Sequence, residues 1–417
     1  MEDPVFSGVK VEALPVSHEK AFSITRDWCD WDRMHGSEYL VPSVLVFSKE
    51  RVKQIATLTE EAYQIFQKTL RYVQQEVPDP YLIHQLGIPE SLVYASRSYV
   101  PFDAITRFDI AISDKRMVIL EYNSDTPTGV VESAYVANSV IRRYTAYENP
   151  SAKLNDRIKK SIRNCIHYYH HQGFQGDILF SATKYSNEDI GTVRYAQAIS
   201  QVESVYAHLE DLRLRAEGLY AGEKKSSIWY RLYPWEHLPH DVDQDGFPVG
   251  KALISLIEEN KLATISPPQS IITQSKGLQA FIWEMARLRH RIYDDAERDL
   301  IQRFMLPSFF DSDHFRSQGI PYVSKPLFGR EGGAVRLFGS NGQLEEQDEA
   351  EHYWDQPVIY QQRVDLPQVH IQTEEGPFSG FMLIGAFCVG GKFAGILPRV
   401  GGRITGNLAY YLPAAMN

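Results

Sequence analysis

The pattern of hydrophobic and polar positions changes from helical to strand-like along the chain. Apolar residues recur at helical spacing over 50–77, where Ser48 can cap the helix, over 130–170 and over 274–304. From about residue 320 onward, short apolar runs bounded by glycine and proline replace this spacing. Helices and strands in separate parts of the chain predict an α+β protein.

The middle of the chain instead predicts a small α/β unit. Residues 177–182 and 226–234 are short apolar runs typical of buried strands, and residues 187–202 between them have helical spacing. A strand, a helix and a second strand in succession form the repeating element of an α/β sheet. We expect this unit to cover about residues 175–255.

The late part of the chain is dominated by strands, one pair of which forms a hairpin. Strands are expected at 321–329, 334–339, 357–366, 381–391 and 392–400. The most apolar stretch, residues 380–397, contains Lys392 and several glycines. This composition favours a hairpin that turns at Gly390-Gly391 over a membrane helix.

Polar side chains interrupt an earlier hairpin, "TRFDIAISDKRMVILEYN", which begins at residue 106. If its loop is residues 114–116, pairing outward from the loop places Asp109 opposite Glu121 and Arg107 opposite Asn123. Because side chains alternate between the two faces of a strand, these polar side chains share one face of the hairpin.

Two interpretations of this face remain open. It is either a solvated surface on which Arg107 neutralises two facing carboxylates, or a site for a divalent cation between them. Two carboxylates and an amide oxygen are hard ligands that Mg²⁺ accepts, with phosphate and water completing its coordination.

A glycine-rich loop, "KPLFGREGGAV", begins at Lys325 and lies between two expected strands. Gly329, Gly332 and Gly333 let the backbone approach a ligand closely, and consecutive amides in such a turn form an anion-binding nest. Lys325 and Arg330 add positive charge. The composition suits phosphate binding, although a glycine-rich hairpin turn without a ligand is an equally good interpretation.

Several other residues have both a structural and a functional interpretation. Lys276 lies at a helix start, where it is either solvated or bound to phosphate. Gln361 and Gln362 either read an adenine edge or pair within a sheet, and Glu236 lies in an aromatic segment typical of a core edge. A helix end carries three histidines on a shared face, where they suit the helix dipole or bind a metal: His167, His170 and His171.

Composition excludes some classes of partner. The net charge is −10 and the pI is about 5.7, so no basic field favours nucleic acid or anionic lipid. The three cysteines are far apart in the sequence and include no CxxC pair, which suits a reducing compartment. The acidic, polar beginning of the chain does not have the pattern of a signal peptide. We therefore expect a soluble, cytoplasmic protein.

These segments also carry a family resemblance. The chain contains, in order, "RFD", "LEYNSDTPT", "YRLYPWEHL", "TQSKGLQAFIWE", "KPLFGREGG", "VIYQQ" and "FAGILPRVGGRITGN". In these motifs it resembles the synthetase module of the glutathionylspermidine synthase family, relatives of trypanothione synthetase with an ATP-grasp fold. The resemblance extends from about residue 20 to the end of the sequence.

The resemblance implies an ATP-dependent ligase that joins a carboxylic acid to an amine through an acyl-phosphate. The acid would be glutathione- or peptide-like and the amine polyamine- or amino-acid-like. The implied cofactors are ATP and Mg²⁺, with two ions expected. The implied metal ligands are Asp109, Glu121 and Asn123, and the implied catalytic residues are Arg107 and Arg330. The implied ATP-binding residues are Lys276, Lys325, Gly332, Gly333, Gln361, Gln362 and Arg399. The implied substrate-binding residues are Thr126, Thr128 and Glu236.

The resemblance also implies a domain organisation. The ATP-grasp body, circularly permuted in this family and similar to the ATP-binding domain of glutathione synthetase, would comprise residues 1–174 and 256–417, with 175–255 as a preATP-grasp-like substrate domain. We expect no counterpart of the amidase domain found in bifunctional relatives, and therefore no hydrolytic activity. The segment "PRVGGRITGN" leaves open whether Arg399 or Arg403 reaches the active site.

Two other functions remain as alternatives. One is a non-catalytic nucleotide-binding protein on the same fold. The other is a peptide-tailoring ligase that acts on a protein or on a carrier-bound substrate.

Overall fold

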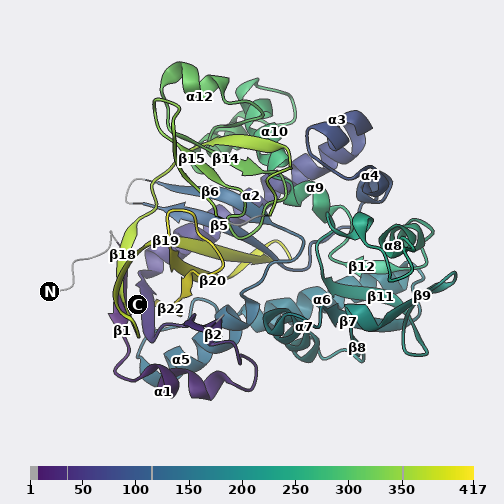
Figure 1. The fold of residues 1–417 in the computed structure, drawn as a ribbon, viewed down its shortest axis with the longest axis horizontal. Helices are drawn as coiled ribbons and strands as arrows, with labels where there is room; N and C mark the ends of the chain where they lie inside the picture. Colours follow the sequence, from purple (N-terminus) through teal and green to yellow (C-terminus); the bar gives the residue numbers. More distant parts are fainter. Residues whose placement is uncertain (1–7, 35, 114–115, 350–351) are drawn as a thin grey trace.

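The computed structural model describes residues 8–34, 36–113, 116–349 and 352–417, and these form a mixed α+β structure with several sheets. Figure 1 shows a central sheet that carries β5, β6, β19 and β20, a smaller sheet with β14 and β15 beside it, and an α/β unit with β7 and β11 on another side. Among the described residues, none of the helices combines the length and the apolar character needed to span a membrane.

The central sheet is antiparallel and has the strand order β21-β20-β19-β5-β6, with β18 also paired to β19. Its strands are β5 (Thr106–Ile112), β6 (Met117–Asn123), β18 (Gln368–Thr373), β19 (Gly376–Val389), β20 (Lys392–Gly401) and β21 (Tyr410–Tyr411). The β19–β20 hairpin turns at Gly390 and Gly391, both at positive φ, which confirms the predicted turn.

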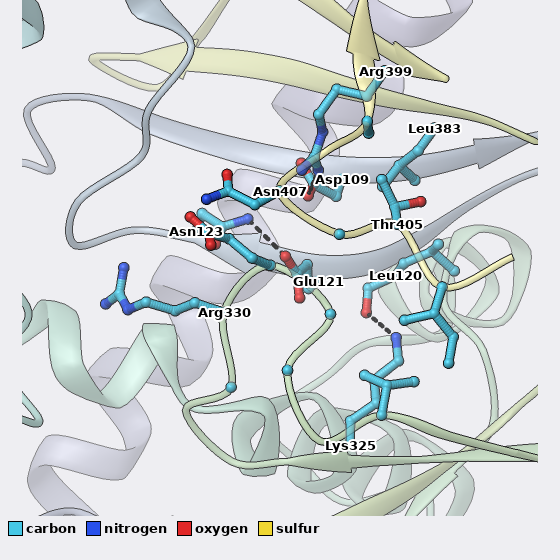
Figure 2. Close-up of a pocket in the computed structure, with 18 of the residues that line it drawn as sticks. Asp109, Leu120, Glu121, Asn123, Lys325, Arg330, Leu383, Arg399, Thr405 and Asn407 are labelled. Carbon is cyan, nitrogen blue, oxygen red and sulfur yellow. Dashed lines mark hydrogen bonds and ion pairs between the residues drawn. The ribbon is translucent and has the colours of Figure 1, made fainter. Parts of the chain in front are cut away.

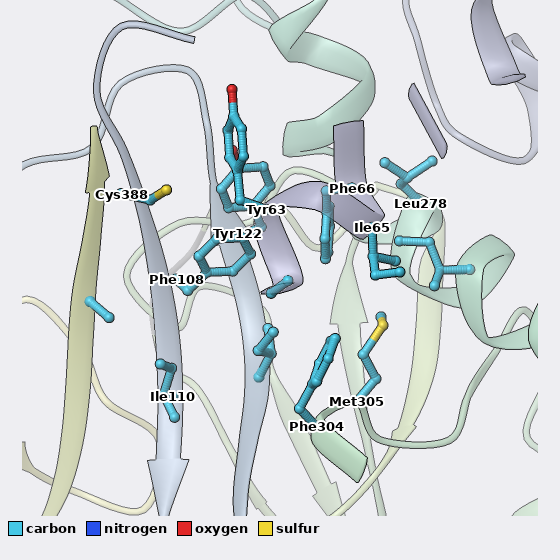
Figure 3. Packing of buried hydrophobic residues seen from close by; sticks show 14 of the residues in the cluster. Tyr63, Ile65, Phe66, Phe108, Ile110, Tyr122, Leu278, Phe304, Met305 and Cys388 are labelled. Atoms are coloured by element: carbon cyan, nitrogen blue, oxygen red, sulfur yellow. The ribbon is translucent and has the colours of Figure 1, made fainter. Parts of the chain in front are cut away.

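The apolar face of the β5–β6 hairpin packs against the long helix α2 (Lys49–Glu76), as Figure 3 shows. Phe108 stacks on Tyr122 across the hairpin at 4.1 Å between ring centroids, and Phe66 of α2 lies edge-on to both rings. The helix begins where the sequence predicts, because the Ser48 hydroxyl accepts a hydrogen bond from the amide of Arg51. Burial of this apolar face leaves the polar face of the hairpin to form a site.

A second antiparallel sheet holds the glycine-rich loop between two of its strands. Its order is β13-β17-β14-β15-β16, and its strands are β13 (Ser308–Phe309), β14 (Tyr322–Pro326), β15 (Arg336–Phe338), β16 (Leu344–Gln347) and β17 (Val358–Gln362). The neighbouring helices are α10 (Lys276–Arg287), α11 (Asp295–Phe304) and α12 (Asp313–Gln318).

The middle of the chain forms the expected α/β sheet, of order β8-β7-β11-β10-β9, with β12 also paired to β11. Its strands are β7 (Asp177–Ala182), β8 (Val205–His208), β9 (Leu212–Arg215), β10 (Gly218–Ala221), β11 (Lys224–Leu232) and β12 (Ala263–Ile265). Strand β7 is parallel to β8 and to β11, as a helical crossover requires. The helices here are α7 (Asn187–Ser200) and α8 (Val249–Glu258).

The beginning and the end of the chain meet in a small sheet in which β4 (Ser43–Phe47) lies between β1 (Val9–Ala13) and β22 (Ala414–Met416). Two short strands, β2 (Arg33–Met34) and β3 (Ser37–Glu38), pair nearby. The remaining helices are α1 (His18–Phe22), α3 (Asp79–His84), α4 (Glu90–Arg97), α5 (Ala137–Tyr144), α6 (Leu154–His171) and α9 (Ser270–Gln274). A π-helical turn, η2 (Glu132–Val136), precedes α5.

Two predicted helices are wrong as single elements. The stretch 130–170 is broken between α5 and α6, where Pro150 follows Asn149 and cannot continue a helix. The stretch 274–304 is broken between α10 and α11, where Arg289 has a left-handed φ of 51° and Asp294 begins α11 with a capping box. Helical periodicity continues across both breaks because each new helix presents its apolar side to the same core.

The buried carboxyl of Asp103 predicts a measurable pH dependence of stability. The side chain accepts a hydrogen bond from Gln67, is 1% exposed, and burial raises its pKa to about 7 against the opposing effect of that bond. The folded protein therefore keeps a proton that the unfolded chain releases near pH 4, so this group lowers the unfolding free energy as pH rises from about 4 to about 7.

We expect Asp103→Asn to remove this pH dependence. The variant should gain stability relative to the wild type between pH 5 and pH 8, by at most roughly 4 kcal/mol, since it stays neutral throughout. Urea unfolding at both pH values measures the difference, with Asp245→Asn, an exposed aspartate, as the matched control. Parallel pH profiles for Asp103→Asn and the wild type would contradict the expectation.

Candidate active site

The β5–β6 hairpin pairs its polar residues as predicted, although its turn differs from the prediction. Asp109 lies opposite Glu121 and Arg107 opposite Asn123. Nearer the turn the register shifts by one residue, and Ile112 pairs with Met117. The loop between the strands therefore has four residues and not three. Residues 114 and 115 of this loop lie outside the described residues. A β-bulge at Leu120 absorbs the difference, because it places an extra residue on β6.

The polar face of this hairpin carries several ion pairs and hydrogen bonds. Figure 2 shows Asp109, Glu121 and Asn123 on this face, with Arg399 beside Asp109. Arg107 contacts Asp109 through its Nε at 2.8 Å and its Nη2 at 3.2 Å, and Arg399 of β20 reaches the same carboxylate at 2.5 Å. Asn123 donates to Glu121 at 3.1 Å, and Lys276 lies 3.3 Å from Glu121. The carboxylates that would repel each other are therefore each neutralised by a cation.

Electrostatics keep these groups charged despite their burial. Burial alone would raise the pKa of Glu121, but Lys276 and Lys325, with the Asn123 hydrogen bond and Arg107, together hold that pKa well below its ordinary value. Burial would lower the pKa of Arg107, but the Asp109 carboxylate raises it above its ordinary value. These contacts favour the ionised form of Glu121, which is the form in which a carboxylate binds a metal.

Two lysines from different elements approach this face. Lys325 of β14 donates from Nζ to the Leu120 carbonyl at 3.1 Å and to Gln361 Oε1 at 2.8 Å. Lys276, at the start of α10, donates to the Gly329 carbonyl at 2.6 Å. Burial lowers the pKa of Lys325 to about 8, with Glu121 opposing the shift.

Residues 329–333 of the glycine-rich loop line the pocket, and Arg330 contacts two predicted substrate-binding residues. Arg330 Nε contacts Glu236 at 2.9 Å, and its Nη1 donates to the Thr126 hydroxyl at 2.7 Å. Gly332 has a φ of 75°, and a Cβ there would lie 3.0 Å from the Thr405 carbonyl, so only glycine fits between this loop and the segment after β20. Thr128 contributes its carbonyl, which accepts from Arg107 at 2.9 Å.

One pocket is lined by nearly all of the predicted site residues, the exception being Glu236, which contacts the pocket residue Arg330. The lining set comprises Arg107, Asp109, Glu121, Asn123, Thr126, Thr128, Lys276, Lys325, Arg330, Gly332, Gly333, Gln361, Gln362 and Arg399. Arg399 and Arg403 both reach this pocket, but they differ in their contacts. Arg399 pairs with Asp109, whereas Arg403 pairs with Glu345 and Glu346 at the rim.

Two buried arginine nitrogens in this pocket suit an anionic ligand. Arg330 Nη2 and Arg399 Nε are buried and have no hydrogen-bond partner among the described residues. Unpaired buried donors are costly, and phosphate oxygens would satisfy them. The donor set therefore fits a polyphosphate, with Asp109, Glu121 and Asn123 as the oxygen ligands for an accompanying divalent cation.

Sequence reasoning missed three residues at this site. Asp125 and Arg231 form a fully buried ion pair at 2.8 Å, and Asp125 also accepts from the amide of Trp235 at 3.0 Å. These contacts of Asp125 connect the end of β11 and the segment that contains Glu236 to the segment after β6. Both residues lie in quoted motifs, Asp125 in "LEYNSDTPT" and Arg231 in "YRLYPWEHL", but no local pattern shows that residues more than a hundred positions apart pair with each other.

The third missed residue is Glu188, in the first turn of α7, which lines the pocket. Burial raises the pKa of Glu188 well above its ordinary value, and the nearby carboxylates of Glu132, Asp189 and Glu331 add to the shift. This part of the site is therefore rich in carboxyl groups, and the crowding favours the protonated form of Glu188. It differs in composition from the side that carries Lys276, Lys325 and Arg399.

The predicted histidine cluster does not form a metal site. His167 and His171 approach to 3.0 Å between their Nε2 atoms on the exposed side of α6. No group of three or more histidine, cysteine, aspartate or glutamate side chains suited to a metal occurs within the described part of the chain.

Comparison with known proteins decides the family. A family model described as glutathionylspermidine synthase preATP-grasp matches residues 12–417. The chain belongs to this family. A Haemophilus influenzae protein, named provisionally as an acid–amine ligase, is 22% identical over 412 residues, which cover 95% of each protein.

The fold has a solved counterpart. A glutathione synthetase-like effector from Globodera pallida superposes with a TM-score of 0.58 and 9% sequence identity, covering 97% of this chain and 100% of that one. This likeness concerns the fold alone: this glutathionylspermidine synthase family member has a fold similar to that of the glutathione synthetase-like protein.

Proposed function

We propose that this protein is an ATP-dependent acid–amine ligase that forms an amide bond through an acyl-phosphate. The observation that carries the proposal is the convergence, in one pocket, of two carboxylates and an amide on the β5–β6 hairpin with Lys276 and Lys325 from separate elements. Family membership and the name of the Haemophilus influenzae relative support a ligase.

The chemistry explains why the site needs both signs of charge. A carboxylate is a poor electrophile, so its oxygen first attacks the γ-phosphorus of ATP and ADP leaves. The amine then attacks the acyl carbon, phosphate leaves, and the nitrogen loses a proton. Mg²⁺ bound at Asp109, Glu121 and Asn123, as two ions in this proposal, would neutralise phosphate charge during the transfer.

The residues of this chain have separate roles in the proposal. Lys276 and Lys325 hold the polyphosphate, and Arg107 and Arg330 stabilise charge on the transferring phosphoryl group. Thr126, Thr128 and Glu236 border the acid substrate. The acid is glutathione- or peptide-like and the amine polyamine- or amino-acid-like.

The acidic part of the pocket suits a cationic amine. Glu188 lines it, and three further carboxylates lie near enough to raise the pKa of Glu188. A positively charged amine would be attracted there and would hold that carboxyl in its ionised form. The basic and acidic parts of the pocket thus match the phosphate and the amine, respectively.

We also propose the domain organisation and setting that the family resemblance implies. The body would be a circularly permuted ATP-grasp fold made of residues 1–174 and 256–417, with 175–255 as the preATP-grasp-like unit. The protein would act in the cytoplasm, on small molecules and not on nucleic acid or membranes.

The test is a panel of acids and amines incubated with MgATP. We expect ADP release that depends on both an acid and an amine, together with a product whose mass equals the two substrates less one water. ATP binding without amine-dependent ADP release would favour the non-catalytic alternative. Turnover only with a protein or carrier-bound acid would favour a peptide-tailoring ligase.

A further inference from the structure

The side-chain amide of Gln361 makes its hydrogen bonds inside the protein. Gln361 is 2% exposed, and its Oε1 accepts from Lys325 Nζ at 2.8 Å. Its Nε2 donates to Ser308 Oγ at 3.2 Å and to Gln279 Oε1 at 3.4 Å. An amide nitrogen has two hydrogens, so both donors of Gln361 are in use.

The orientation of this amide follows from the chemistry of its neighbour. A lysine ammonium can only donate, so the carbonyl oxygen of Gln361 must be the atom that faces Lys325. The nitrogen then faces Ser308 and Gln279, which can both accept. A flipped amide would set two donors against each other at 2.8 Å.

The backbone of Gln361 is also held within the sheet. In β17 this residue pairs with Ser308 on one side and with Val323 on the other. A strand residue with neighbours on both sides has its backbone groups directed into the ladders. Neither the side chain nor the main chain of Gln361 is therefore placed to read the edge of a nucleotide base.

Lys325 is held by two acceptors from two different sheets. One is the Gln361 side chain, and the other is the Leu120 carbonyl, which belongs to the bulged residue of β6. The ammonium has three hydrogens, so one remains for a ligand in the pocket that Lys325 lines. Its direction is set by the two bonds already made.

We propose that Gln361 is a positioning residue, which fixes the ammonium of Lys325 for contact with the polyphosphate and does not recognise the adenine base. This inference rests on the proposed ATP-dependent function. Ser308 and Gln279 hold Gln361 in turn, so the effect of Gln361 on nucleotide binding passes through Lys325.

The experiment compares MgATP with magnesium tripolyphosphate, a ligand that has the phosphates but no base. Calorimetric titration of both ligands is made with the full-length wild type, Gln361→Met, Lys325→Met and the double variant. We expect Gln361→Met to weaken both ligands by the same factor, on the order of tenfold, as for the loss of a hydrogen bond to a charged group. In the Lys325→Met background, Gln361→Met should have no further effect.

Three results would overturn the inference. One is a loss of ATP affinity with unchanged tripolyphosphate affinity, which would mean that Gln361 contacts the base. The second is full additivity with Lys325→Met, and the third is no effect of Gln361→Met on either ligand. A wild type that binds neither ligand would instead refute the proposed function and this inference with it.

A second variant keeps the test valid if Gln361→Met does not fold. Ser308→Ala removes one acceptor of Gln361 at a position that lines no part of the pocket. We expect Ser308→Ala to lower the affinity for MgATP and for magnesium tripolyphosphate by the same factor, and by less than Gln361→Met does. A loss confined to ATP would contradict the inference here too.

Discussion

Arg330→Ala should lower kcat by about two to three orders of magnitude, which is the usual cost of removing a donor that stabilises transition-state charge. The guanidinium contacts Glu236 and Thr126, its Nη2 has no partner among the described residues, and it belongs to the glycine-rich loop that lines the pocket. Because Lys276 and Lys325 remain, the KM for ATP should change far less than kcat. Steady-state kinetics with saturating acid and amine measure both constants.

The interpretation of Arg330→Ala needs a control for the carboxylate that it leaves behind. Glu236 is buried, and Arg330 is the main cause that lowers its pKa against the effect of burial. The double variant Arg330→Ala/Glu236→Gln removes the unpaired charge and should recover thermal stability without recovering kcat. Arg303→Ala, an exposed arginine of α11, should leave kcat unchanged. Equal losses in kcat and ATP affinity after Arg330→Ala would argue against a transition-state role.

Glu121→Gln should weaken MgATP binding at least about tenfold, since even the partners of metal ligands commonly contribute that much. The substitution keeps the size of the side chain and its contact with Asn123 but removes the charge that Mg²⁺ requires. Without Mg²⁺ the expected change is the opposite. Lys276, released from its ion pair with Glu121, should then hold the phosphates of free ATP at least as well as in the wild type.

The contrast between the two conditions separates a metal ligand from a residue that merely stabilises the pocket. Titrations of ATP with excess Mg²⁺ and with a chelator measure it in the same protein sample. Glu61→Gln, a half-buried residue of α2 that pairs with Arg303 and does not line the pocket, serves as the control and should change neither affinity. Equal weakening of ATP binding with and without Mg²⁺ would refute the assignment of Glu121 as a ligand.

The contacts of Asp125 with Arg231 and Trp235 link the middle α/β unit to the side of the pocket where Arg330 lies. Asp125 precedes Thr126 directly, and Trp235 precedes Glu236. Arg330 makes hydrogen bonds to both Thr126 and Glu236. The segment after β6, the segment after β11 and the glycine-rich loop are therefore all connected by hydrogen bonds near the Arg330 guanidinium. Movement of the middle unit would therefore change the position of Arg330 directly.

Part of the site could be predicted because it depends on strand alternation alone. Arg107, Asp109, Glu121 and Asn123 share a face wherever the β5–β6 hairpin forms in register near them. The predicted pairing of these four residues is confirmed although the predicted turn length is wrong, because the bulge at Leu120 restores the register before the polar residues. Local composition likewise marked the glycine-rich loop and its two basic residues as suited to phosphate.

The sequence by itself determined the α+β class, the polar face of the hairpin and the family. The first two follow from the spacing of apolar and polar residues over short segments, and the family follows from motifs that occur in a fixed order. Tertiary structure alone decided that Arg399 meets Asp109, that Arg231 pairs with Asp125, and that Gln361 faces Lys325. The physical reason is separation along the chain. A buried charge or amide needs a partner, but no local rule specifies which of many distant residues packing will bring within hydrogen-bond distance.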